Sequence, residues 1–235
     1  MILALVIGVG GKLLPALFGI YNPSLVQLTS FQPTGAAALK RRWDSVKFPV
    51  LSAILVTGFL VEGLAGQRTG AGAGAAIQAL TYSFVGVAEW RLHRRPVARG
   101  HLPFWLWISA WALALGLWGA ALLPAYSVHA MHLAYAGGFG LMVLMIAARV
   151  TLAHGGYGLE LEHRSRALLW SGILVGLAAL TRATAILLPR AYMSHLAYAA
   201  VTWIIGWLVW AWVFLPRIVR PSTGRPSDAD PRHPG

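Results

Sequence analysis

Long apolar runs separated by short polar segments are the feature of this sequence that most restricts its fold. Each run is about 17–25 residues long, the length that an α-helix needs to cross the hydrocarbon core of a bilayer. The runs are Ile2–Tyr21, Phe48–Ala65, Ala71–Trp90, Pro103–Leu123, His129–Leu152, Ala167–Leu188 and Tyr192–Leu215. The sequence therefore predicts an all-α, polytopic transmembrane helix bundle of about seven spans within residues 1–215.

The composition excludes an ordinary soluble domain. Hydrophobic residues make up 57% of the 235 residues and charged residues only 11%, whereas soluble chains carry about 25% charged residues. The chain has no cysteine, so disulfides and thiolate metal sites are excluded. Histidine, methionine and carboxylates remain as side chains that could ligate a metal or haem.

The distribution of basic residues predicts the orientation of the bundle. Lys and Arg number 19 against 7 Asp and Glu, and they gather after the first, third, fifth and seventh runs, as in Lys40–Lys47 and Arg91–Arg99. The loops after the second, fourth and sixth runs hold only Arg68 and Arg190. Because Lys and Arg favour cytoplasmic loops, we expect the amino terminus outside and the carboxyl terminus in the cytoplasm. The basic excess thus reflects contact with a lipid bilayer rather than with nucleic acid.

A short segment after the last span is predicted to form a cytoplasmic tail. Residues 216–235 interleave five prolines with Ser, Asp and Arg. Such a composition buries too little apolar surface to fold, so we expect this tail to be disordered.

Charged residues inside the apolar runs are costly in a membrane and usually face the interior of the bundle or water. The four are Lys12, Glu62, Arg149 and Arg182. Glu62 and Arg182 fall at similar depths near the outer ends of the second and sixth spans. They form a candidate pair, interpreted either as a structural ion bridge or as part of an anion-binding site.

Three histidines share the outer leaflet with Arg182. His129 and His132 lie three residues apart, on one face of the fifth span, and His195 begins the seventh. Such a set could bind a transition metal through the three imidazoles, or haem with the arginine facing a propionate. The alternative is that they are solvated interfacial histidines. We take His129, His132, His195 and Arg182 as candidate cofactor-binding residues, with the three histidines as candidate metal ligands, and identify no catalytic residue.

Small and aromatic residues mark two packing faces. Gly137, Gly138 and Gly140 follow His132 and would allow close approach of another helix, which we favour, or of a flat macrocycle. Trp203, Trp207 and Trp210 form a stripe on the last span. We interpret the stripe as packing or lipid contact rather than an electron-transfer path.

One block, from the fifth span into the loop after it, holds His132, Gly137, Gly140, Met142, Arg149, His154 and Gly156. The spacing of this block is similar to the signature of the NnrS family, bacterial membrane proteins associated with denitrification and nitrosative stress. Gly10–Phe18 is similar to a second family segment. Arg182 falls at the family's arginine in the next-to-last helix, and Trp203 falls at its tryptophan in the last helix.

This resemblance implies a protein of the bacterial inner membrane that contains haem and copper and acts in nitric oxide metabolism, without a defined catalytic reaction. Family members generally have about twelve helices, and this chain resembles their carboxyl-terminal portion without the His-rich amino-terminal half. Lys12 replaces the usual arginine, and Ala153–Gly156 replaces a Gly-His-Thr-Gly turn. A separate protein could supply the remaining helices.

Three functions follow as hypotheses. The first is a haem or copper protein that scavenges, senses or detoxifies nitric oxide, and it requires a bound metal. The second is a small-molecule permease or channel, with Lys12, Glu62 and Arg182 lining a polar route. The third is a non-catalytic assembly subunit of a split NnrS-like protein. An absorption spectrum of the purified protein separates the first from the other two.

Overall fold

The computed structural model describes residues 35–64, 71–96, 100–155, 161 and 164–219. Helices account for almost all of this part of the chain, and it contains no β-strand. The longer helices are α3 Gly35–Leu64, α5 Ala71–Ala88, α6 His101–Leu122, α8 Leu141–His154, α10 Arg166–Thr184 and α11 Tyr192–Val219. The short helices are η1 Pro124–Tyr126, α7 Ser127–His132, η2 Leu133–Gly140, η3 Ala185–Leu187 and η4 Pro189–Ala191. The all-α prediction is confirmed for the described residues.

Five of the predicted spans are long and apolar enough to cross a membrane. They are Val46–Leu64, His101–Leu122, Pro124–Ala153, Arg166–Leu187 and Pro189–Val219. The predicted span Ala71–Trp90 is a shorter apolar helix, Gly72–Ala88. It stops there because the amides of Glu89 and Trp90 both bond to the carbonyl of Val85, and Arg91 then adopts a positive φ of 50°. The first predicted span, Ile2–Tyr21, lies outside the described residues.

Two predicted boundaries were wrong. The basic segment Lys40–Lys47, expected to be a loop, belongs to α3, because lysine and arginine are good helix formers. The last helix continues through Pro216 to Val219 instead of ending at Leu215. A proline removes only one backbone hydrogen bond here, so the helix extends into the segment predicted as a tail. Residues 220–235 of that tail lie outside the described residues.

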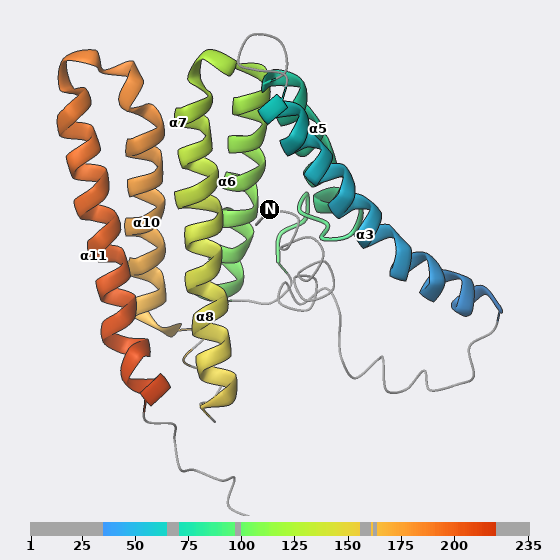
Figure 1. Ribbon diagram of the computed structural model, residues 1–235. Helices are drawn as coiled ribbons and strands as arrows, with labels where there is room; N and C mark the ends of the chain where they lie inside the picture. Colours follow the sequence, from blue (N-terminus) through green and yellow to red (C-terminus); the bar gives the residue numbers. More distant parts are fainter. Residues whose placement is uncertain (1–34, 65–70, 97–99, 156–160, 162–163, 220–235) are drawn as a thin grey trace, which may run out of the picture.

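The helices run up and down in the order of the chain. The short helices α7 and η2 continue into α8 as one rod, and this rod stands side by side with α6, α10 and α11 (Figure 1). The helices α3 and α5 pack against each other and lean away from this row, with α5 also packed on α6 (Figure 1). The ends of α8 and α11 therefore lie on one side of the bundle (Figure 1). The segment that joins α10 to α11 lies on the opposite side.

Glycines set the closest helix contacts. A Cβ added at Gly116 of α6 would lie 2.6 Å from the backbone nitrogen of Ala134 in η2, and one at Gly74 of α5 would lie 2.5 Å from the carbonyl oxygen of Gly58 in α3. Gly137 also lies tightly packed, 3.0 Å from Ala179 by the same measure, which confirms its predicted packing role. Gly140 is more open, since its nearest neighbour is at 3.4 Å.

Polar side chains join the leaning helices to one another and to the row. Lys47 Nζ lies 2.8 Å from Glu89 Oε1, which ties the start of the α3 span to the end of α5. Near the other end, Gln78 Nε2 donates to Glu62 Oε2 at 2.9 Å. The Tyr82 hydroxyl donates to the carbonyl of Ala110 in α6 at 3.0 Å. Such pairing is what buried polar groups require in a membrane.

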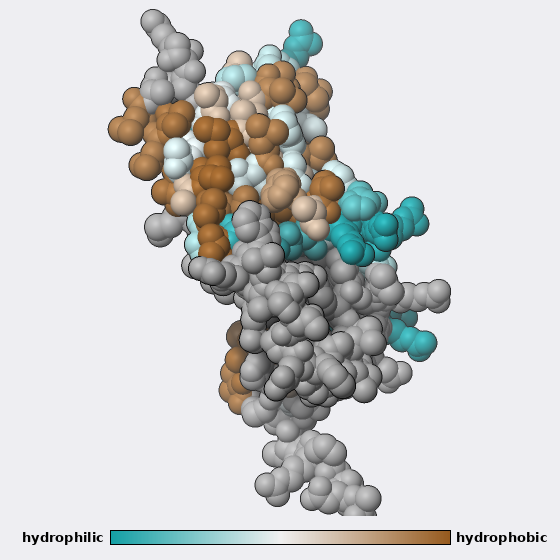
Figure 2. Space-filling model, turned by 90° about the vertical axis from the view of Figure 1, so that its right-hand side faces the viewer, coloured by the Kyte–Doolittle hydropathy of each residue, from teal (hydrophilic) through white to brown (hydrophobic). Residues whose placement is uncertain are grey.

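The outer surface of the bundle is strongly apolar. Seen from the side of α3 and α5, hydrophobic residues cover most of the described surface, and hydrophilic residues gather mainly in one band (Figure 2). Large hydrophobic side chains such as Leu60, Phe84 and Leu115 are more than half exposed, and Trp212 is 85% exposed. This surface suits lipid rather than water, and the chain is a multi-pass membrane protein in contact with the bilayer.

Candidate functional site

The predicted site residues lie at the end of the bundle where α10 and α11 are joined. The turn η1 begins with Pro124, whose fixed φ suits the first position of a helix. It leads into α7, which carries His129 and His132 in its last turn. A π-helical stretch, η2, follows at once and continues into α8. π-helical turns inside α-helices frequently occur at functional sites.

Arg182, in the last turn of α10, contacts His129. Its Nη1 lies 3.3 Å from His129 Nδ1, and both residues are half-buried. Because a guanidinium can only donate hydrogen bonds, His129 Nδ1 accepts, and the neutral ring carries its proton on Nε2. The ring of His129 also meets Tyr192 of α11 edge-on, with centroids 6.0 Å apart. His129 therefore contacts Arg182 through Nδ1 and helps to position it.

His132 has the opposite tautomer. Its Nδ1 lies 2.6 Å from the carbonyl oxygen of Val128, one turn earlier in the helix. A carbonyl oxygen only accepts, so Nδ1 carries the proton and Nε2 keeps its lone pair. A backbone carbonyl at Nδ1 is the usual arrangement for a histidine that ligates a metal through Nε2.

His195 in α11 resembles His132 in its hydrogen bonding. Its Nδ1 lies 3.1 Å from the carbonyl oxygen of Ala191. The tautomer is again the one suited to ligation through Nε2. The side chain lies one helical turn after Tyr192, which contacts His129, so His195 belongs to the same end of the bundle.

A pocket of about 450 Å³ opens between η2, α10 and α11 beside these residues. His132 and Arg182 supply its polar groups. Its walls are Ala136, Ala178, Leu196, Ala199, Ala200, Trp203 and Ile204. Four of these residues are alanines, whose short side chains leave space between the helices. The pocket therefore suits a ligand with a broad apolar body and an anionic or metal-bearing group at its polar end.

The structure brings three of the four predicted residues together. His129 contacts Arg182, and His132 and Arg182 line one pocket, whereas His195 is not a pocket wall. Within the part of the chain that is described, no three metal-ligating side chains are grouped closely enough to hold an ion. The proposed Glu62–Arg182 pair is not formed, because Glu62 accepts from Gln78 and Arg182 contacts His129.

The sequence analysis missed the pocket walls. Ala178 with Arg182, and Ala199 with Trp203, each stand four residues apart, so each pair shares one helix face. A small residue four positions from a polar or aromatic residue can indicate a pocket wall, but the same pattern is also common where helices simply pack together. Trp203 was interpreted as part of a packing stripe. It does pack on Trp207, with centroids 5.3 Å apart, and it also lines the pocket.

Comparison with known proteins decides the family. The family model described as NnrS protein matches residues 1–222 of the 235. This chain belongs to the NnrS family. No curated protein and no solved structure matches it.

Membership in the NnrS family confirms the resemblance found in the sequence. Three residues that carried the resemblance, His132, Arg182 and Trp203, come from separate helices and line one pocket. Gly140 lies beside the same tryptophan, since a Cβ added there would be 3.7 Å from Trp203 Nε1. Lys12 and the Gly10–Phe18 segment lie outside the described residues. Three of the residues that resemble the family therefore converge in space, whereas Arg149 lies further along α8 and does not line the pocket.

Proposed function

We propose that this NnrS-family protein binds haem in the pocket between η2, α10 and α11 and acts in nitric oxide metabolism or protection from nitrosative stress. The observation that carries the proposal is the joint lining of that pocket by His132 and Arg182. Imidazole is a common axial ligand of haem iron. A guanidinium forms charge-assisted bonds to a carboxylate, whose burial at this depth would otherwise be costly.

The residues of the pocket fit a haem group. His132 Nε2 has a lone pair for the iron, Arg182 suits a propionate, and the alanine walls and Trp203 suit a flat apolar macrocycle. When bound, haem iron supplies a coordination position for a small diatomic ligand such as nitric oxide. In this proposal His132 holds the group, His129 orients Arg182, and the apolar walls exclude water from the polar end of the pocket.

The donor set favours haem over a three-histidine copper site. A copper site would require several imidazoles at one point, and the described residues hold no such group. Copper bound through His132 or His195 would need a further ligand from elsewhere. Haem needs one imidazole from this chain.

The test is the spectrum of the protein purified from a haem-sufficient host, together with its metal content. We expect a Soret band that is abolished or shifted by His132→Ala, because the axial nitrogen is lost. His93→Ala is the matched control, since His93 is exposed after the end of α5 and does not line the pocket, and it should keep the wild-type band. An unchanged spectrum in His132→Ala contradicts the proposal. Wild-type protein with neither haem nor copper would favour the permease or the assembly subunit instead.

We further propose that the protein lies in the bacterial inner membrane with its amino terminus outside and its carboxyl terminus in the cytoplasm. The basic residues support this orientation. Arg149, Arg166 and Arg217 lie toward the helix ends on one side of the bundle, whereas the segment joining α10 to α11 on the other side holds Arg190. Positive residues favour the cytoplasmic side.

Cysteine labelling tests the orientation cleanly in a chain that has no cysteine of its own. We expect Ala125→Cys, in the exposed turn η1, to react with a membrane-impermeant maleimide in intact cells. Ser222→Cys should react only after the membrane is opened. The reverse pattern would show that the orientation is wrong.

A further inference from the structure

The connection from α5 to α6 is fixed against the side of α6 rather than at its end. The carbonyl oxygen of Leu92 accepts hydrogen bonds from Trp107 Nε1 at 2.8 Å and from Trp111 Nε1 at 3.2 Å. The Leu92 side chain is buried, and a Cβ added at Gly86 would lie 2.7 Å from its Cδ1. Both the backbone and the side chain of Leu92 therefore hold this loop in place.

The loop lies at a depth that belongs to the membrane interior. Trp107 and Trp111 stand six and ten residues after His101, the first residue of α6, so their level is about 9–15 Å along that helix. In Figure 1 the chain leaves α5 well above the lower end of α6. The 22 residues of α6 are about 33 Å long, close to the hydrocarbon core of a bilayer at about 30 Å. The loop thus lies inside the half of the core in which α6 begins.

Apolar surface continues past the level of the loop. A Cβ added at Gly138 would lie 2.9 Å from Leu113 Cβ, which sets the register between η2 and α6. Because these helices run in opposite directions, Trp107 lies near the level of Leu144. Val150 is six residues further along α8, about 9 Å, and is 49% exposed. The lipid-facing surface therefore extends beyond the loop toward the ends of α8 and α11.

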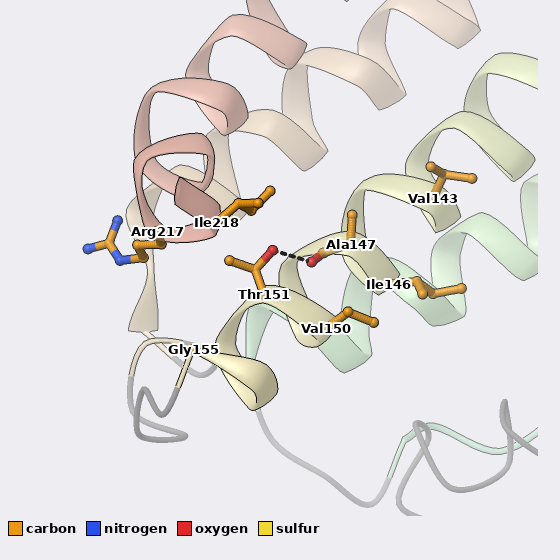
Figure 3. A pocket seen from close by; sticks show the side chains of 8 residues that line it. All are labelled: Val143, Ile146, Ala147, Val150, Thr151, Gly155, Arg217 and Ile218. Atoms are coloured by element: carbon orange, nitrogen blue, oxygen red, sulfur yellow. Dashed lines mark hydrogen bonds between the residues drawn. The ribbon is translucent and has the colours of Figure 1, made fainter. Parts of the chain in front are cut away.

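The hollow between the ends of α8 and α11 shows what this depth looks like elsewhere. Val143, Ile146 and Val150 line it, and the Thr151 hydroxyl is satisfied within its own helix (Figure 3). The guanidinium of Arg217 points away from the hollow (Figure 3). These walls suit lipid chains, whereas the α5–α6 loop presents charge.

The described part of the loop, residues 89–96, carries exposed basic side chains. They are Arg91, His93, Arg94 and Arg95. Seen from the side of α3 and α5, the hydrophilic band lies at about this height (Figure 2). The acid of these residues is Glu89, and its Oε1 lies 2.8 Å from Lys47 Nζ. Among the described residues, no ion pair joins the three arginines to a carboxylate.

Exposed arginines at this depth require water around them. A charged side chain in hydrocarbon is costly, and non-helical backbone at membrane depth is tolerated only where protein buries it or where it lines a water-filled cavity. Because the arginine side chains are exposed, the second condition applies. Like charges beside low-dielectric walls also raise the local concentration of ions of opposite sign.

We propose that this loop lines a water-filled entrance that selects small anions over cations, with Arg91, Arg94 and Arg95 as the selecting charges. The entrance opens toward the side of the bundle where α8 and α11 end, which is the cytoplasmic side in the orientation proposed above. Guanidinium groups suit small oxyanions because their N–H donors match planar oxygen pairs. The inference is independent of haem binding, since none of these residues lines the haem pocket.

Cysteine accessibility tests the entrance in a chain that has no cysteine of its own. The full chain carrying His93→Cys is placed in phosphatidylcholine nanodiscs and treated with an anionic or a cationic methanethiosulfonate. Each rate is divided by the rate of the same reagent with free mercaptoethanol. We expect His93→Cys to react with both and to favour the anionic reagent about tenfold, the lower end of the range for electrostatic focusing in a cleft.

Matched positions separate the entrance from the rest of the surface. Phe84→Cys, on the exposed apolar face of α5 one turn before its end, should resist both reagents because a thiol in lipid does not ionise. Ala125→Cys, in the exposed turn η1, should react with both at similar normalised rates. Arg94→Gln together with Arg95→Gln should bring the ratio at His93→Cys close to that at Ala125→Cys.

The proposal fails if His93→Cys reacts with neither reagent, because protein or lipid then covers the loop. Equal rates for the two reagents, or a preference that survives the loss of Arg94 and Arg95, would remove the selecting role of the arginines. Reaction of Phe84→Cys as fast as that of His93→Cys would show that the whole face is wet. Loss of the preference in phosphatidylglycerol nanodiscs, measured against Ala125→Cys, would mean that lipid headgroups occupy the site instead of free anions.

Discussion

Gly116→Ala is expected to destabilise the bundle by about 1–3 kcal/mol, the usual cost of overpacking a tight contact. The added methyl would lie 2.6 Å from both the Cβ and the backbone nitrogen of Ala134, and 2.7 Å from the carbonyl oxygen of Ala130. Two of these three atoms are backbone, so no side-chain rotation relieves the clash. The helix α6 must then move away from α7 and η2, which carry His129 and lead into the pocket.

The measurement is the free energy of unfolding in mixed detergent micelles. Gly176→Ala in α10 is the matched control, because its added Cβ would meet only Trp105, at 3.9 Å, an ordinary contact. Helix propensity favours alanine over glycine by about 1 kcal/mol, so the control should keep or gain stability. Equal stability in the two variants would mean that α6 and η2 do not approach as closely as described.

Arg182→Ala is expected to weaken haem retention about 10–100-fold, the range typical for a partner that orients or neutralises a bound group. In the proposed site the guanidinium would hold a propionate and would not be a ligand of the iron. The Soret position should therefore stay unchanged while haem leaves faster. The measurement is the rate of haem transfer to an excess of a tight haem-binding acceptor.

Arg190→Ala is the control for Arg182→Ala, since Arg190 is exposed in η4 at the same end of the bundle and does not line the pocket. It should release haem at the wild-type rate. Arg182→Ala with that same rate would remove the propionate partner from the proposal.

His129→Ala separates its positioning role from a ligand role in the same assay. Because His129 Nδ1 accepts from Arg182, the variant should release haem faster without a shift of the Soret band. A shifted band would instead make His129 a ligand.

The helical class and most spans could be predicted because they depend on local sequence. An apolar run of bilayer length forms a helix wherever it lies, since its backbone groups must bond internally in lipid. The boundaries that were wrong, at Lys40–Lys47 and at Pro216, lie where basic residues or a proline mark a loop in a pattern but are tolerated in a helix. The short helix that ends at Ala88 depends on two bonds to one carbonyl, which no hydropathy pattern encodes.

For the site, the sequence by itself determined how deep in the membrane each candidate residue lies. The spacing of His129 and His132, and the position of Arg182 near the end of its run, place all three at one end of the bundle. It did not determine contacts, because Glu62 and Arg182 also share a depth and yet have different partners. Which helices become neighbours depends on the close approach of glycines such as Gly116 and Gly137 to residues far away in the chain. Only that tertiary packing decided the pocket walls, and only the hydrogen-bond partners of each ring decided which histidine keeps a lone pair on Nε2.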